Sequence, residues 1–151
     1  MLINKIDQDI KQAMLAKQEV RLRGLRAIKS ALLLARTEKG ASEDLTEETE
    51  LRVLQKLIKQ RKDSLEIYQG QQRKDLAQKE EEEIAIIEKF LPKQITGEEL
   101  KAILQKIIAE TGASSPADMG KVMGAASKQL AGKADGKSIS TAVKEFLSKP
   151  A

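Results

Sequence analysis

A short segment near the end of the chain, GKADGKS (Gly132 to Ser138), has the glycine, lysine and serine types of a phosphate-binding loop. A Walker loop has four residues between its first glycine and the Gly-Lys-Ser/Thr element, whereas three stand between Gly132 and Gly136. That loop also follows a buried strand, and here an amphipathic helical pattern precedes Gly132. The spacing and the context therefore argue against a nucleotide-binding loop.

Glycine and lysine nevertheless recur as adjacent pairs in this region, at Gly120-Lys121, Gly132-Lys133 and Gly136-Lys137. Glycine has no Cβ to keep a ligand from the backbone, and lysine supplies a mobile positive charge. Backbone amides at the start of a final helix can point at an anion beside them, so the pattern favours contact with RNA phosphates. Two structural interpretations stay open. Gly132 and Gly136 are also suited to a helix C-cap and a turn, and the spacing of Gly120 and Gly124 is typical of close helix packing.

Catalytic side chains are scarce, because the chain has neither histidine nor cysteine. The commonest general base, the thiolate nucleophile and the usual zinc ligands are therefore missing. The acidic run from Lys79 to Glu83 is interpreted as a solvated helix face, since consecutive carboxylates on a helix point in different directions. We expect no catalytic residue, no cofactor and no metal ion.

Aromatic residues are also few, with one Tyr, two Phe and no Trp. Stacking on single-stranded bases is then nearly unavailable, so an RNA partner would be a folded RNA recognised by its shape and backbone. Positive charge is concentrated at the two ends: the net charge is +5 for residues 1–40, −5 for 41–100 and +4 for 101–151. This asymmetry favours a polyanion meeting one or both ends, with ordinary surface variation as the alternative.

Nearly every apolar position fits a 3.6-residue period, which predicts an all-α protein. An N-terminal antiparallel helical bundle is expected over residues 1–93, followed by a small three-helix tail domain over 94–151. Pro92 is expected to close the fourth helix, and the predicted N-caps are Thr46, Thr96 with Glu99, Ser115 with Asp118, and Ser138. No apolar run approaches the ~20 residues of a membrane helix and the first residues do not resemble a signal peptide, so a cytoplasmic location is expected.

Several ordered segments of the chain resemble the GatB/YqeY family, in particular its free-standing YqeY-type members. They are RLRGLRAIKSALL (21–33), IKQRKDSLEIY (58–68), RKDLAQKEEEEIAIIEKFLPKQ (73–94) and the tail DMGKVMG…GKADGKSIS…VKEFL. The resemblance implies a helical bundle and a small helical tail. In the B subunit of the tRNA-dependent glutamine amidotransferase, a similar tail is associated with holding the misacylated tRNA. The catalytic domain of that subunit, which binds ATP and metal, has no counterpart here.

The leading hypothesis is therefore a non-catalytic accessory module that binds tRNA or another folded RNA, without DNA or membrane as a partner. Lys121, Lys133 and Lys137 would contact phosphates, and Gly120, Gly132 and Gly136 would allow close approach. Arg61 and Arg73 are secondary candidates. So is the basic patch of the second predicted helix, which consists of Arg21, Arg23, Arg26 and Lys29. One alternative is an adaptor for a protein partner, such as one in aminoacyl-tRNA metabolism. Another is an accessory subunit in carbon–nitrogen ligase activity with glutamine as the amide donor.

Overall fold

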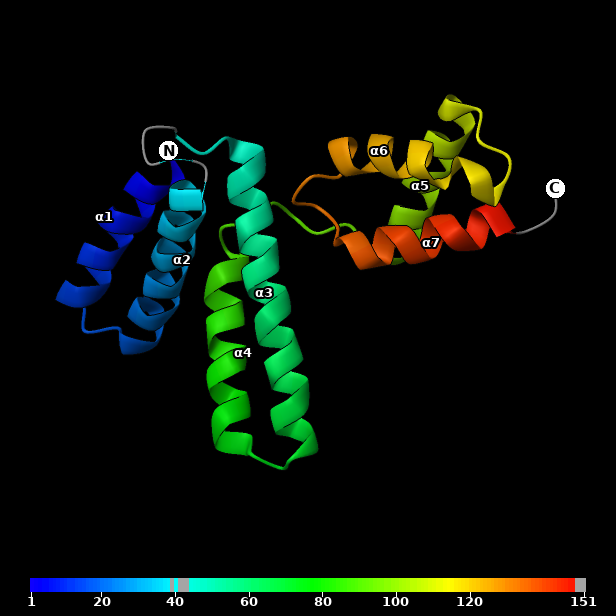
Figure 1. Cartoon of the computed structure of the whole chain (residues 1–151). Helices are drawn as coiled ribbons and strands as arrows, with labels where there is room; N and C mark the ends of the chain where they lie inside the picture. Colours follow the sequence, from blue (N-terminus) through cyan, green and yellow to red (C-terminus); the bar gives the residue numbers. More distant parts are fainter. Residues whose placement is uncertain (39, 41–43, 149–151) are drawn as a thin grey trace. The chain divides into compact units, whose positions relative to one another are not determined.

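The computed structural model describes residues 1–38, 40 and 44–148, and within them all regular structure is helical (Figure 1). The predicted all-α class is confirmed. The chain divides into two compact units, Met1–Leu91 and Pro92–Ala151. The first unit contains α1 (Leu2–Leu15), α2 (Glu19–Glu38), α3 (Glu47–Gly70) and α4 (Lys74–Glu88), and the second contains α5 (Gly97–Thr111), the 3-10 turn η1 (Pro116–Asp118), α6 (Met119–Gln129) and α7 (Gly136–Ser148).

In the first unit, α2 is the helix that contacts all three others, and α3 and α4 form a helical hairpin beside it (Figure 1). The core between them is aliphatic, as the scarcity of aromatic residues requires. Gly24 on α2 lies where a Cβ would come within 2.8 Å of Ile86 on α4, so α2 and α4 approach closely at this point. The buried residues of the core are Ile6, Ala13, Leu25, Ile28, Leu32, Leu54, Leu57, Ile58, Ile84 and Ile87.

Ion pairs also join the helices of the first unit. The Arg23 guanidinium on α2 donates to Glu82 Oε2 at 2.9 Å and to Glu83 Oε1 at 3.2 Å, both on α4. Arg61 on α3 donates to the other oxygen of Glu83 at 3.0 Å. Burial, followed by the charge of Glu83, raises the pKa of the neighbouring Glu80. The expectation that this acidic run is a solvated face is therefore wrong for Glu82 and Glu83, which connect three helices.

The second unit encloses a separate apolar core contributed by α5, α6, α7 and the segment before α7. Short polar side chains accept backbone N–H groups at the start of η1 and of α7. The Asp118 carboxylate accepts the backbone N–H groups of Ser114 at 3.0 Å and Ser115 at 3.2 Å, which confirms the predicted pairing of Ser115 with Asp118. The buried core residues are Leu100, Leu104, Ile107, Val122, Ala126, Leu130, Ala134, Ile139, Ala142, Val143 and Leu147.

The predicted helix boundaries hold in some places and fail in others. Thr46 caps α3, because its hydroxyl accepts the Thr49 backbone N–H at 3.2 Å. Thr96 precedes α5 as expected, but its side chain makes no capping hydrogen bond. Pro92 does not close α4, because the helix ends at Glu88. The residues between Glu88 and the proline form tight turns. A proline marks a limit that a helix does not cross, and the helix can stop earlier.

Candidate nucleic-acid interface

The connection between α6 and α7 carries the pair Gly132-Lys133, the pair Gly136-Lys137 begins α7, and local hydrogen bonds determine the course of the connection. Gly132 adopts a left-handed φ of 73° and is buried. Its carbonyl accepts the Gln94 side-chain amide at 2.7 Å, and the Lys133 carbonyl accepts the Ile95 backbone N–H at 2.7 Å. A left-handed residue after a helix favours glycine. Gly132 therefore serves the turn after α6 and is not an open backbone position for a phosphate.

The N-terminus of α7 already has an anionic partner. Asp135 immediately precedes the helix, and its carboxylate accepts the Ser138 backbone N–H at 2.7 Å and the Ser138 hydroxyl at 2.8 Å. Asp135, and not the predicted Ser138, is the residue that caps the helix. A carboxylate in this position satisfies the helix end that a phosphate would otherwise occupy. The geometry thus disfavours a phosphate held by the first amides of α7.

The lysines of this region are exposed and form no close ion pair among the described residues. Lys121, Lys128, Lys133 and Lys137 are all exposed. No Asp or Glu carboxylate in the part of the chain that the structure describes lies within 4 Å of any of their ammonium groups. Ammonium groups that have no carboxylate partner remain available to a polyanion, because binding does not first require an ion pair to break.

Helix α6 presents an open glycine face beside two of these lysines. An added Cβ at Gly120 or Gly124 would meet no atom within 4 Å, so the expected packing of this face against a neighbouring helix is wrong. Gly120, Lys121, Gly124 and Lys128 instead line one shallow depression. Sequence reasoning did not select Lys128, although its position seven residues after Lys121 places both on one helix face. This depression combines exposed backbone and positive charge.

The two secondary arginines have a different environment. Arg61 is committed to Glu83, and Arg73 donates to both carboxylate oxygens of Asp75 at 3.2 and 3.1 Å. The hydrogen bond with Asp75 raises the pKa of Arg73, and the same contact lowers the pKa of Asp75. The assignment of Arg61 and Arg73 to RNA binding stays a prediction, and each arginine would have to exchange its carboxylate partner for a phosphate.

The basic patch of α2 is largely neutralised as well. Arg21 lies 3.7 Å from Asp9, and Lys29 lies 2.7 Å from Asp7, both carboxylates on α1. Arg23 contacts Glu82 and Glu83 as described above. Only Arg26 among the basic residues of 21–29 is exposed with no ion pair inside the described residues. The patch stabilises the first unit and leaves little charge for a ligand.

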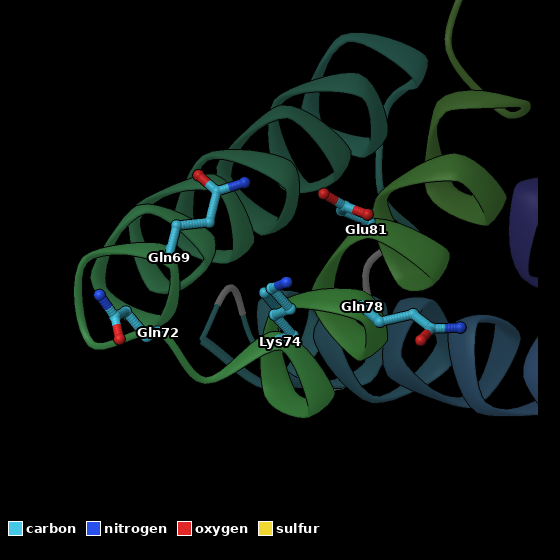
Figure 2. Close-up of a pocket in the computed structure, with 6 residues that line it drawn as sticks. Gln69, Gln72, Lys74, Gln78 and Glu81 are labelled. Carbon is cyan, nitrogen blue, oxygen red and sulfur yellow. The ribbon is translucent and has the colours of Figure 1, made fainter.

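A pocket of about 890 Å³ opens at the end of the α3–α4 hairpin (Figure 2). Gln69 and Gln72 come from the end of α3 and its turn, while Lys74, Gln78 and Glu81 come from α4. The lining combines amides with one ammonium and one carboxylate group, so it has no dominant charge. None of the predicted RNA-binding residues contributes to it.

Residues 3–147 match the sequence model of a family described as Yqey-like protein. The chain belongs to the YqeY-like family. Three fungal relatives are each called "Altered inheritance of mitochondria protein 41, mitochondrial". The relative from Kluyveromyces lactis is 34% identical over 140 residues, which cover 91% of this chain and 71% of the relative. The relative from Clavispora lusitaniae is 34% identical over 131 residues (85% and 74%), and that from Lachancea thermotolerans is 32% identical over 116 residues (76% and 62%).

The names of these YqeY-like relatives correct one expectation. A cytoplasmic location was inferred from the sequence, and the relatives are named as mitochondrial proteins. The cytoplasmic prediction is therefore wrong. Among the described residues, no helix is both long and apolar enough to span a membrane, and no three potential metal-ligating side chains are grouped together.

Proposed function

We propose that this YqeY-like protein is a non-catalytic accessory module that binds tRNA or another folded RNA through its second unit. The observation that carries the proposal is the set of exposed ammonium groups on α6 and at the α6–α7 connection that have no carboxylate within 4 Å among the described residues. The open glycine face of α6 adds backbone that an RNA strand can approach closely. The near absence of aromatic residues favours phosphate and shape recognition over base stacking.

The geometry divides the predicted contacts into two groups. Lys121 and Lys128 line the α6 depression, whereas Lys133 and Lys137 flank the acidic cap Asp135. Asp135 repels a phosphate at the start of α7, so we assign the larger share of affinity to the α6 pair. Gly120 supports close approach in this proposal, Gly136 is exposed at the start of α7, and Gly132 acts through the turn.

A gel-shift titration with tRNA tests the assignment. The Lys121→Glu/Lys128→Glu double variant is expected to lose tRNA retention with unchanged helicity, and Lys133→Glu/Lys137→Glu is expected to lose less. A matched control, Lys62→Glu/Lys79→Glu, makes the same change in net charge on exposed lysines of the first unit. If the control weakens binding as much as the α6 variant, net charge and not this surface determines retention, and the proposal fails.

Salt dependence provides a second test of the same surface. If the four lysines neutralise about four phosphates, the logarithm of the affinity falls against the logarithm of salt with a slope of about −3 to −4. Removing the α6 pair is expected to reduce that slope by about half. Because the relatives are named as mitochondrial proteins, we include a mitochondrial location in the proposal, and transcripts of mitochondrial tRNAs are suitable probes. Duplex DNA of equal length is the comparison ligand.

The ligase alternative has a direct test of its own. A glutamine-dependent amidotransferase acting on misacylated tRNA would have to produce more amidated product when this chain is added. We expect no change in that yield.

A further inference from the structure

A groove of about 290 Å³ runs between α2 and α3 in the first unit. The lysines of α6 and α7 belong to the second unit and do not line this groove. The apolar residues of its lining are Ala31, Leu34, Ala35, Val53 and Leu57. Ala31 and Ala35 lie one helical turn apart on α2, and their short side chains leave room between the two helices. Leu34 is 63% exposed, which is high for a leucine that borders an apolar groove.

Single exposed apolar side chains are ordinary on protein surfaces. Ile67, for example, is 58% exposed on α3 and lines none of the concave sites described above. Leu34 differs because it continues into a concave apolar floor. The combination of an exposed aliphatic side chain and a groove is typical of a site that buries side chains of another molecule.

The groove is flanked by charge of one dominant sign along α3. Arg52 and Lys56 line it one turn apart, and the exposed Lys59 follows on the same helix. Lys56 has no carboxylate within 4 Å among the residues that the structure describes. Arg52 pairs with Glu48 in the preceding turn, where both side chains are at least half exposed, and such a surface pair exchanges partners at little cost. Glu38, at the end of α2, is the one acidic residue in the lining.

We propose that this groove binds an amphipathic helix of a protein partner. The apolar side chains of the partner helix would pack against Leu34 and Val53, and its acidic side chains would face Arg52 and Lys56. The lining residues of α3 extend from Thr49 to Gln60, which corresponds to about 16 Å of helix, or three turns. A partner helix of that length presents apolar residues at positions i, i+3, i+4 and i+7 to such a groove. The position of Glu38 on the α2 side gives the complex a preferred orientation, because acidic residues are attracted to α3 and repelled from α2.

Designed peptides test the proposal with the full-length chain. The probe is a fluorescein-labelled 18-residue helical peptide with leucines at i, i+3, i+4 and i+7 and glutamates along one flank. Two comparison peptides carry lysines in place of the glutamates or the same residues in scrambled order. Fluorescence polarisation is expected to show at least tenfold tighter binding of the glutamate peptide than of either comparison peptide.

Two pairs of variants locate the contact. Leu34→Gln is expected to weaken binding of the glutamate peptide by about tenfold, whereas Leu33→Gln, on an exposed leucine outside the groove lining, changes it by less than twofold. Lys56→Glu is expected to reverse the preference between the glutamate and lysine peptides, and Lys62→Glu on the same helix leaves it in place. Circular dichroism confirms that each variant keeps its helicity.

Three outcomes would overturn the proposal. They are equal binding of the lysine and glutamate peptides, equal loss in the Leu33 and Leu34 variants, and no binding of any labelled peptide when the chain is in 100-fold excess over it. Sedimentation of the chain alone tests whether a second copy of the chain occupies the groove. A concentration-dependent dimer that Leu34→Gln abolishes would assign the groove to a second copy and not to an acidic helix of another protein. None of these measurements uses RNA, so their failure leaves the RNA proposal standing.

Discussion

Arg23 on α2 is held by two carboxylates of α4, whereas Lys121 on α6 has no carboxylate within 4 Å among the described residues. The contrast extends over the two units. In the first unit, most positive side chains of residues 21–29 on α2, and Arg61 on α3, pair with acids on other helices, whereas in the second unit the exposed lysines of α6 and α7 have no such partners in the described range. Positive side chains can therefore contribute to stability in one unit and remain available for binding in the other.

This contrast changes the meaning of the charge distribution in the sequence. The basic segment 1–40 and most of the acidic segment 41–100 belong to the same unit, and their charges meet in the Arg23–Glu82, Arg23–Glu83 and Arg36–Asp44 contacts. The basic segment 101–151 has only four acids of its own. The two basic ends of the sequence thus differ in how far their charges are paired, although their net charges are nearly equal.

The largest effect that we predict concerns two helix glycines, one from each unit. Gly24→Ala is expected to destabilise the chain by about 2 kcal/mol, because the new methyl group would lie 2.8 Å from the branched Ile86 side chain. Gly124→Ala is expected to stabilise it by about 0.5 to 1 kcal/mol, since the site is open and alanine favours helix. Urea denaturation of each variant measures its change in the free energy of unfolding. Destabilisation by Gly124→Ala would show that α6 is packed and would weaken the contrast between the units.

A second prediction tests the ion pairs of the first unit. Glu83→Ala removes one carboxylate from Arg23 and the main partner of Arg61, and the side chain of Arg61 is only 18% exposed. We expect a loss of about 1.5 kcal/mol, because partly buried charged donors are left without their acceptor. Asp75→Ala breaks the exposed pair with Arg73 and is expected to lower the denaturation midpoint much less than Glu83→Ala does. Equal effects of the two substitutions would contradict the distinction between structural and peripheral pairs.

How far the sequence predicts this molecule depends on the range of the interactions involved. The helices follow from apolar periodicity and from local caps, which is why the sequence alone predicts the Thr46 cap and the Ser115–Asp118 pair. Both signals involve residues within a few positions of one another. The prediction that Pro92 closes α4 is wrong because a proline limits a helix without fixing its last residue, and α4 ends at Glu88.

The candidate site depends on contacts that periodicity does not reveal. Arg61 resembles a phosphate ligand in the sequence, and only the fold shows that Glu83, twenty-two residues away, holds it. Gly120 and Gly124 resemble a packing face, and only the fold shows that no neighbour covers them. Asp135 was within reach of sequence reasoning, because an Asp three residues before Ser138 is a common N-cap arrangement.

A smaller effect is predicted for Asp135, the acidic residue between Lys133 and Lys137. Asp135→Asn keeps a side-chain oxygen that can cap α7, so the free energy of unfolding is expected to stay nearly constant. Removal of the negative charge is expected to tighten tRNA binding by about two- to threefold at low salt, which corresponds to well under 1 kcal/mol. Filter binding at several salt concentrations measures it. Unchanged affinity would indicate that tRNA does not approach the start of α7.

The smallest predicted effect separates the two ways in which the units hold a carboxylate. The backbone N–H groups of Ser114 and then Ser115 lower the pKa of Asp118, and Lys121 contributes least, whereas the hydrogen bond from Arg73 is the first cause that lowers the pKa of Asp75. A folded-state pKa below the unfolded value, about 3.9, means that each carboxylate adds stability above that pH and loses it as the pH falls through the folded pKa.

The two aspartates should therefore respond differently to salt. At pH 7, Asp118→Asn is expected to lower the denaturation midpoint slightly in both 0.1 and 1 M NaCl, because hydrogen bonds from backbone amides are screened little. Any difference between Asp75→Asn and the unsubstituted chain is expected to disappear at 1 M NaCl, since that exposed contact is with a mobile guanidinium. Both differences should vanish below the folded pKa values, where the carboxylates are protonated. An Asp118 effect that high salt removes would mean that Lys121, and not the backbone, is its main partner, and Lys121 would then be less available to RNA.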